Sequence, residues 1–244
     1  MKKSKKLIYS LILVLFIGIV YNASKLKNQF DKIDKTDEYW EYPVQKALDF
    51  SHIRIEGGNR TYSGISPGTE NKLFYKSEIE SQFKYSVVND TLIIEFDKDM
   101  ITTKVNQKQF RRYKVLITYA ELKSISTNDS YLDFGLDTME ELKIETEGFT
   151  TLKIESNGAQ LDTLNIEMSE NAFTVFRDTD NPMNVKLLKT KLVDSSFIDL
   201  TSIKAETFLP EIFGKSEMGI GSGLKWPVSN VVKPTTVIDS IQSR

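Results

Sequence analysis

The feature that most constrains the fold of this chain is a strand-forming sequence pattern that recurs about every twenty residues. ELKSIS at Glu121, ELKIET at Glu141, TLNIEM at Thr163 and NVKLLK at Asn184 begin successive units. The leading apolar residues of these units, separated by 20, 22 and 21 positions, are Leu122, Leu142, Leu164 and Val185. A second column lags by roughly half a unit and reads SYLDF, TLKIES, AFTVF, SFIDL and EMGIG. Each unit therefore carries two short strands.

A period near twenty with turn residues between strands is what a β-solenoid requires, because each coil returns the chain about 4.8 Å above the last. Alternate residues then point into the core, and the expected inward ones are Leu142, Ile144, Leu152, Ile154, Leu164 and Ile166. Their neighbours Lys143, Glu145, Lys153 and Glu155 are expected to face water. An antiparallel sandwich or barrel stays open as an alternative, because its strands also recur every 8 to 12 residues or so. Repetition of near-identical text favours the all-β solenoid, with about 20–22 residues per coil.

Turn residues mark the corners of the expected coils. Asn157-Gly158, Gly148 and Gly135 are residues that tolerate positive φ, which we expect where a coil turns a corner. The glycine-rich GIGSG from Gly219 to Gly223 lacks the Lys-Ser/Thr of a phosphate loop and no helical pattern follows it, so we expect a tight last coil there.

The N-terminus predicts a membrane segment. Four lysines in the first six positions precede fifteen residues, Leu7 to Tyr21, that only Ser10 interrupts with a hydroxyl. As a helix these residues span roughly 22 Å, less than the ~30 Å of a hydrocarbon core, so a secretory signal peptide and a short anchor both remain open. Bulky Tyr21 is unfavourable for cleavage after Ala23, which favours an uncleaved signal-anchor. The residues expected to contact lipid are Leu7, Leu11, Leu15, Phe16 and Val20.

This segment also predicts location. With the lysines on the cytoplasmic side, the body of the chain is extracytoplasmic or periplasmic, held by a single pass in the inner membrane. If the segment is cleaved, the body is secreted or at the cell surface instead.

We divide the chain into four parts. Residues 1–24 are the signal-anchor or signal peptide and residues 25–45 a polar juxtamembrane stalk. Residues 46–223 are the β-solenoid domain, and residues 224–244 a C-terminal cap and tail. Trp226 and Val228 are expected to cover the last coil, because an open solenoid end exposes strand edges and apolar side chains.

Charge and composition exclude several classes of function. Beyond residue 6 the chain has 28 basic and 34 acidic residues, a net charge of −6 without a basic patch, so nucleic acid is not an expected partner. The absence of cysteine removes disulfides, thiolate nucleophiles, thiolate metal sites and a lipidated-cysteine anchor. We expect no metal and no cofactor.

Catalytic chemistry has few candidates. His52 is the one histidine, so a usual zinc site is excluded and a Ser-His-Asp site would have to form around this ring. The main enzymatic alternative is a polysaccharide lyase or glycoside hydrolase that uses carboxylates on an exposed face, such as Asp133, Glu155 and Asp199. No pair can be nominated without their separations, so we expect no catalytic residues.

Three stretches carry a resemblance to a known family. ALDFSHIRIEGG from Ala47, SVVNDTLIIEF from Ser86 and YKVLITYAELKSIS from Tyr113, followed by the repeated strands, resemble the bacterial envelope family "putative auto-transporter adhesin, head GIN domain" (DUF2807). The resemblance covers most of residues 46–223 and implies a right-handed parallel β-helix exported to the envelope, without defined catalytic residues. Members usually repeat a small Gly-Ser-rich turn, whereas the equivalent turns here read NDS, EGF, ENA and DSS.

These observations predict a non-catalytic, membrane-tethered solenoid that acts as a scaffold or adhesin-like module for envelope glycan or protein. A signalling or assembly partner that acts through its membrane helix is a further alternative.

Overall fold

The computed structural model describes residues 2–31, 39, 42–58, 62–97, 114–178, 180–224 and 238–239. The chain divides into two compact units, Met1–Tyr42 and Pro43–Arg244. The first contains one helix, and the second contains the β-structure.

The first unit is built around helix α1 (Lys2–Phe30), which follows the lysine cluster and the apolar run. Three of the residues expected to contact lipid, Leu15, Phe16 and Val20, are 59%, 63% and 51% exposed. The side chains of the other two, Leu7 and Leu11, lie outside the described residues. Across the part of the chain that the structure describes, no helix is both long enough and apolar enough to cross a membrane.

The second unit contains two sheets in its described ranges. Sheet A has ten strands, which in spatial order are β1 (Val44–Ala47), β4 (Lys72–Tyr75), β7 (Val115–Tyr119), β3 (Tyr62–Pro67), β9 (Tyr131–Gly135), β11 (Thr151–Glu155), β13 (Phe173–Arg177), β15 (Phe197–Leu200), β17 (Glu217–Ile220) and β18 (Ile238–Asp239). Sheet B has eight, which are β16 (Ile203–Ile212), β14 (Met183–Leu192), β12 (Gln160–Met168), β10 (Met139–Glu147), β8 (Ser124–Asn128), β2 (His52–Glu56), β6 (Thr91–Phe96) and β5 (Phe83–Val88). A short 3₁₀ helix, η1, covers Ser77–Gln82.

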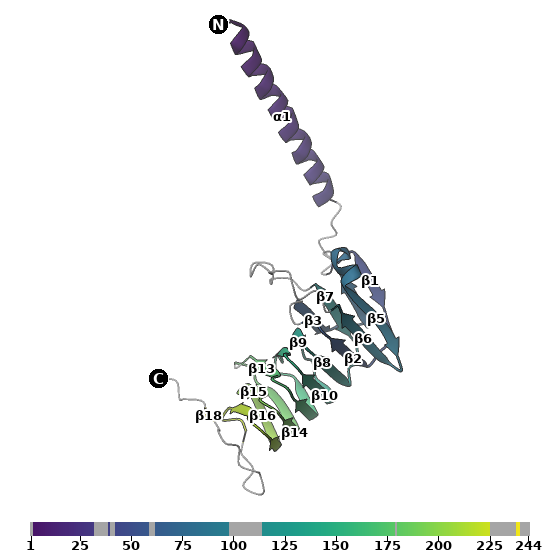
Figure 1. Cartoon of the computed structure of the whole chain (residues 1–244), viewed down its shortest axis with the longest axis vertical. Helices are drawn as coiled ribbons and strands as arrows, with labels where there is room; N and C mark the ends of the chain where they lie inside the picture. The colour runs from purple at the N-terminus through teal and green to yellow at the C-terminus, as the bar shows by residue number, and fades with distance from the viewer. Residues whose placement is uncertain are drawn as a thin grey trace. The chain divides into compact units, whose positions relative to one another are not determined.

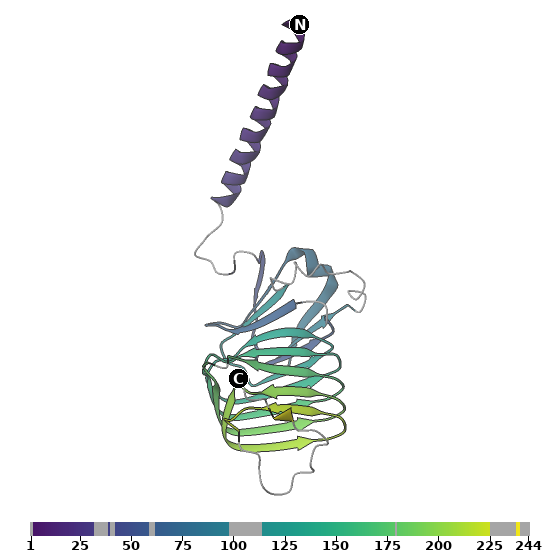
Figure 2. The same ribbon diagram turned by 90° about the vertical axis from the view of Figure 1, so that its left-hand side faces the viewer.

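The predicted all-β solenoid is confirmed. From β8 to β17 the chain alternates between the sheets, and from β10 on each of these strands pairs in parallel with the strand one coil earlier, as β10 with β8 and β12 with β10 (Figures 1 and 2). Parallel pairing sets the coils about 4.8 Å apart. The two sheets face each other across one hydrophobic core.

The core consists of columns of apolar side chains that stack from coil to coil. Leu142 pairs with Leu164, Leu164 with Leu188 and Leu188 with Phe208, and all four are buried. Each such side chain stabilises the fold by about 1.5–3 kcal/mol through burial. All six residues predicted to point inward are fully buried, so the alternation along the repeated strands reports burial correctly.

The coil lengths differ from those that the repeated text suggested. Ser124 pairs with Lys143, 19 positions later, so Leu122 precedes β8 and is not the counterpart of Leu142. At the third unit the partner of Leu164 is Leu188, 24 positions later, whereas Val185 pairs with Leu161. The predicted alignment is therefore wrong by one residue at β8 and by three at β14. The added residues of the longer coil lie in the link between β13 and β14. Because this link lies outside the paired strands, its length does not change which side chains stack in the core.

The first two coils do not stack in chain order. In sheet B strand β2 lies between β6 and β8, and in sheet A strand β3 lies between β7 and β9. The β2–β3 coil thus lies in the stack between the β6–β7 coil and the β8–β9 coil, although it comes before both in the sequence. Antiparallel pairing of β4 with β7 and of β5 with β6 reverses the chain direction at this end, and β1 pairs with β4 outside them. These antiparallel strands form the N-terminal cap that the sequence left undefined.

Left-handed residues turn the corners between β-strands. Gly148 (φ 67°), Asn157 (φ 43°) and Gly158 (φ 76°) have positive φ, as predicted. Gly135 does not, because it belongs to β9. Its small size has another reason, since a Cβ atom there would lie 3.3 Å from Cδ of Pro67 on the neighbouring strand. The prediction that Gly135 has a positive φ at a corner is therefore wrong.

Small side chains fill the inner side of the corner that leads from sheet B to sheet A. The buried residues at this position, one in each successive coil, are Ser130, Thr150, Ala172, Ser196 and Ser216. Hydrogen bonds link several of them to adjacent coils, such as that between the hydroxyls of Ser196 and Ser216 at 3.2 Å. Polar atoms at this tight corner are satisfied locally, as buried hydroxyls require.

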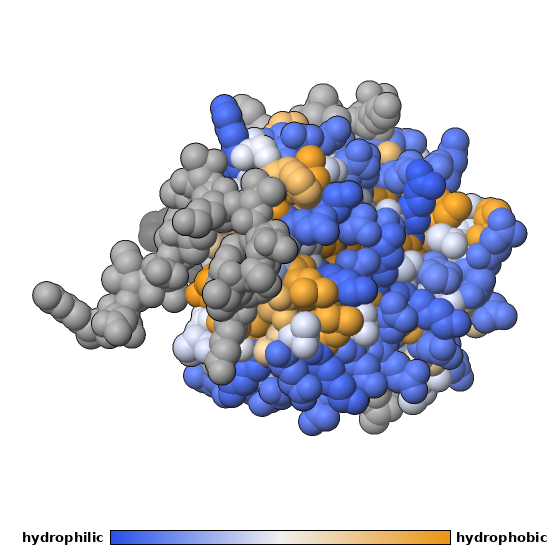
Figure 3. Space-filling view, turned by 90° about the horizontal axis from the view of Figure 1, so that it is seen from below, coloured by the Kyte–Doolittle hydropathy of each residue, from blue (hydrophilic) through white to orange (hydrophobic). Residues whose placement is uncertain are grey.

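The last coil leaves an apolar surface at the C-terminal end of the solenoid (Figure 3). Leu209 and Phe213 of this coil are 48% and 43% exposed. Strand β18 adds to β17 in parallel, so residues from the predicted cap do extend sheet A. Trp226 and Val228, expected to cover the last coil, lie outside the described residues.

We expect Leu164→Ala to destabilise the protein by about 2–5 kcal/mol, because it opens a cavity in the middle of a fully packed column. Chemical denaturation followed by circular dichroism measures this loss. Asn165→Ala, one residue along the same strand and facing outward, serves as the control and should change stability by less than about 0.5 kcal/mol. Equal effects of the two substitutions would contradict the assigned inward and outward faces.

Gly158→Ala should destabilise the protein by about 1–2 kcal/mol, because a side chain disfavours the left-handed backbone at this corner. Gly219→Ala is the matched control, since Gly219 lies in β17 without positive φ and an added Cβ would have no contact closer than 3.4 Å. Thermal unfolding of both variants tests the difference. A larger loss at Gly219 would speak against the described corner geometry.

Candidate functional site

The outer side of sheet A carries an aromatic ladder, defined as Tyr62, Tyr131, Phe173 and Phe197. Tyr62 and Tyr131 are paired residues on adjacent strands with ring centroids 5.4 Å apart, and Phe173 and Phe197 are stacked at 5.3 Å with an angle of 10° between their planes. Stacked rings cover each other's faces. The ladder consists of two pairs that Thr151 separates in the column, and each pair stabilises the pairing of its two strands.

The three carboxylates proposed for a glycan-cleaving enzyme all lie on this outer side of sheet A. Asp133 and Asp199 occupy one column, but Lys153 and Val175 stand between them. Three strand spacings separate the two acids by about 14 Å, beyond the separation of about 5–9.5 Å that glycosidases use. Glu155, on the adjacent column, lies 3.8 Å from the guanidinium of Arg177. The structure brings these residues to one face, where Asp133 and Asp199 are too far apart to act as a catalytic pair and Glu155 is paired with Arg177.

Asp133 and Lys153 take part in contacts with the tyrosines of the ladder. Tyr62 donates a hydrogen bond to Asp133, and the ammonium of Lys153 bonds the Tyr131 hydroxyl and lies 4.4 Å from the centre of its ring. Partial burial, together with nearby Arg177, lowers the pKa of Lys153. This network joins adjacent coils through a charge-assisted contact of the cation–π type.

His52 lies at the start of β2 and contacts a serine. Its Nδ1 is 2.7 Å from Oγ of Ser124 on the paired strand β8. Asp90, the nearby acid, accepts a hydrogen bond from Ser51, which holds the pKa of that carboxyl below its usual range. A catalytic triad needs the acid to orient the histidine ring. The pair His52–Ser124 therefore lacks the third member in its required role.

The outer side of sheet B contains a polar groove of about 620 Å³, which we call the serine groove. Its floor is Ser124 and Ser126 on β8. Longer side chains stand on both neighbouring strands, with Arg54 paired to Ser126 on one side and Glu145 on the other. The short serines between them leave the groove open along β8. The other side chains that line it and are not buried are those of His52, Glu56, Thr91, Asn128, Glu147, Glu167, Ser169, Lys191 and Val193.

Ion pairs fix the charged side chains around the serine groove. Lys143 lies 2.6 Å from Glu145 and 3.4 Å from Glu167, and its hydrogen bond to Glu145 raises the pKa of the ammonium group. Arg54 and Glu56 form a second pair along β2. Glu56, Glu145 and Glu167 therefore each have a cation beside them, and the groove offers both hydrogen-bond donors and hydrogen-bond acceptors.

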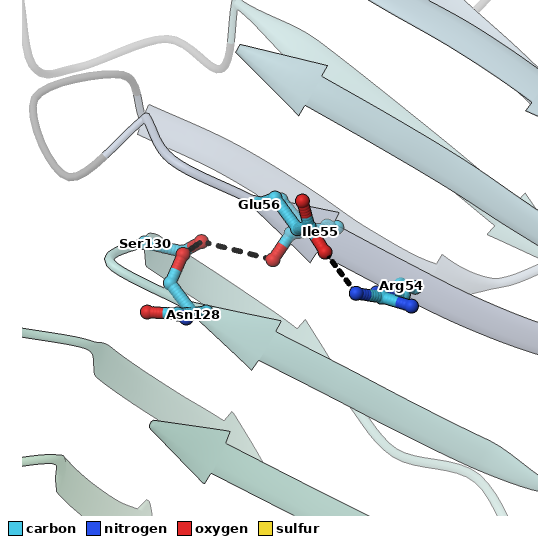
Figure 4. Close-up of polar contacts among 5 residues, drawn as sticks. All are labelled: Arg54, Ile55, Glu56, Asn128 and Ser130. Atoms are coloured by element: carbon cyan, nitrogen blue, oxygen red, sulfur yellow. Dashed lines mark hydrogen bonds and ion pairs between the residues drawn. The ribbon is translucent and has the colours of Figure 1, made fainter. Parts of the chain in front are cut away.

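One end of the groove is held by Ser130, at the corner between β8 and β9 (Figure 4). Its hydroxyl lies 3.4 Å from the carbonyl oxygen of Ile55 and 2.9 Å from those of Gly57 and Asn128. These contacts join the ends of β2 and β8, the strands that carry Arg54 and the groove serines. The groove is thus built on paired strands rather than on loops.

The sequence does contain a pattern that indicates this groove, but it becomes visible only when the repeated strands are aligned in the register of the structure. In correct register, Ser124-Ile125-Ser126 is the counterpart of Lys143-Ile144-Glu145 and of Asn165-Ile166-Glu167. The inward isoleucine is kept, while long outward side chains are replaced by serine in one coil alone. Among the described residues no group of three or more acids, histidines or cysteines is placed to hold a metal ion.

Comparison with solved structures finds proteins of similar fold. A Parabacteroides merdae protein described as a putative adhesin superposes with a TM-score of 0.51 at 15% identity, over 72% of this chain and 79% of that one. A Bacteroides fragilis protein with the same description gives 0.49 at 17% identity, over 80% and 90% of the two chains. No family model and no curated protein matches the chain, so the resemblance to the head GIN domain family stays a prediction. The chain shares the fold of the Parabacteroides merdae protein.

Proposed function

We propose that this protein is a non-catalytic binding module of the cell envelope whose serine groove holds a linear, hydroxyl-rich glycan. The observation that carries the proposal is the groove itself, a polar furrow of about 620 Å³ on a rigid sheet. Serine hydroxyls, the guanidinium of Arg54 and the carboxylate of Glu145 offer donors and acceptors suited to sugar hydroxyls. Sites on paired strands hold such groups more accurately than sites on loops.

A binding role fits the chemistry of the groove better than catalysis does. Glu145 and Glu167 share Lys143, and Glu56 is paired with Arg54. A general acid for glycoside cleavage usually lies in an apolar environment. These three carboxylates instead contact cations on an outer face of the sheet, so their surroundings are those of polar binding groups. The description of the Parabacteroides merdae neighbour as a putative adhesin points in the same direction.

Attachment to the membrane is part of the proposal. Helix α1 carries exposed Leu15, Phe16 and Val20 behind a cluster of lysines, and water is an unfavourable surrounding for such apolar side chains. We place this helix at the cytoplasmic membrane with the solenoid on the outer side, because lysines are retained in the cytoplasm. The alternatives are a cleaved segment, with release of the solenoid, and an interfacial helix.

The serine groove is tested by filling it. In calorimetric titrations of the full chain in detergent with soluble envelope oligosaccharides, we expect saturable binding that Ser126→Trp weakens by about tenfold or more, equivalent to about 1.4 kcal/mol. Thr151→Trp, an outward residue on sheet A, is the control and should bind as the wild type does. Binding that survives Ser126→Trp would place the ligand elsewhere, and release of reducing ends during the assay would show an enzyme instead.

The orientation is tested by single cysteines, which the natural chain lacks. We expect Phe149→Cys, at a corner residue that is 70% exposed, to react with a membrane-impermeant maleimide added to cells whose outer layers are permeabilised. Ser4→Cys should react only after the cytoplasmic membrane is opened, because the lysine cluster stays inside. Labelling of both cysteines before that step would contradict the proposed anchor.

A further inference from the structure

The first residues of β10 form an open strand edge. Met139 and Glu141 pair with Leu161 and Thr163 of β12 on one side. On the other side β8 begins only at Ser124, the partner of Lys143, so none of the described strands pairs with Met139–Glu141 there. The same segment of β12 has neighbours on both sides, since Leu161 also pairs with Val185 of β14. An open edge offers backbone hydrogen-bonding groups to another strand.

A cleft of about 950 Å³ lies at this edge, and we call it the corner cleft. It is lined by Met139–Glu141, by Tyr119 at the end of β7 and by the link between β7 and β8, which includes the buried side chain of Leu122. Pro67 at the end of β3 and the two residues after it, Gly68 and Thr69, also line it. The order of the first coils explains the space, because β7 leads directly to β8 past the β2–β3 coil and leaves none of the described strands beside Met139–Glu141 on this side.

Acidic residues predominate at the rim of the corner cleft. Four carboxylates line it, those of Glu121, Asp137, Glu140 and Glu141, against two lysines, Lys123 and Lys143. Lys143 is held by Glu145 and Glu167, and Lys123 lies 3.8 Å from Glu121. Within the described ranges Asp137, Glu140 and Glu141 have no ion-pair partner. The cleft therefore attracts positive charge, and the partly exposed side chain of Met139 offers apolar contact.

We propose that the corner cleft binds an extended, lysine- or arginine-rich segment of a partner protein, which adds as a strand to Met139–Glu141. In this mode of recognition backbone hydrogen bonds supply affinity and alternate side chains supply specificity. Basic side chains of the segment contact the exposed carboxylates of Glu140 and Glu141, and an apolar side chain contacts the partly exposed Met139. The site adds a protein partner to the glycan proposed for the serine groove and does not depend on it.

The probe is a peptide of about seven residues that alternates lysine and valine, enough for one short strand. Fluorescence anisotropy with the full chain in detergent should show binding that weakens as salt is raised, because the attraction is between exposed charges. A peptide of the same length that alternates glutamate and valine should not bind. Methylation of alternate backbone nitrogens of the basic peptide should abolish binding, because it removes the donors that pair with the edge.

Variants of the protein locate the site. The double variant Glu140→Lys/Glu141→Lys should lower the affinity for the basic peptide by about tenfold or more, since it reverses the charge of the rim. Glu206→Lys/Glu211→Lys, at two exposed glutamates of β16, is the matched control and should leave the affinity unchanged. Hydrogen exchange should show new protection of the Met139–Glu141 amides in the complex. Equal binding of both peptides, binding that survives N-methylation, or equal effects of the two double variants would overturn the proposal.

Discussion

Parallel backbone pairing holds each coil about 4.8 Å from the next, and this spacing places every inward side chain directly over its counterpart in the coil before. The column from Leu142 to Phe208 shows the result, since its four members are buried although the coils between them differ in length. The same spacing orders the outer surfaces, where the aromatic ladder and the serine groove both consist of residues in register. Core and surface thus depend on one repeat.

The sequence pattern predicted which residues of a single strand are buried. It did not predict which residues on different strands pair with each other. The buried state of Leu164 and Ile166 follows from alternation along a single strand, which burial on one face enforces. The partner of Leu164 was not predictable in this way, because Val185 and Leu188 are equally apolar and only the turn length selects between them. The position of the β2–β3 coil beneath a later one leaves no mark on any strand's own pattern.

The two proposed binding sites have different physical origins within the same fold. The serine groove comes from side-chain size, because Ser124 and Ser126 lie between long residues on both neighbouring strands. The corner cleft comes from topology, because the link from β7 to β8 leaves one side of Met139–Glu141 unpaired among the strands that the structure describes. The first was readable from the sequence once the register was known. The second required the order of the coils in space.

The long coil that contains β13 and β14 shows that the links between strands can change in length while the core stays the same. Its 24-residue separation, against 19, 20 or 22 in other coils, leaves the core columns intact because the added residues lie outside the paired strands. Corners of a solenoid are therefore natural points of insertion during evolution. Longer links at the corner beside Met139 would raise a new wall around the cleft, so related chains can acquire different partners while their cores stay the same.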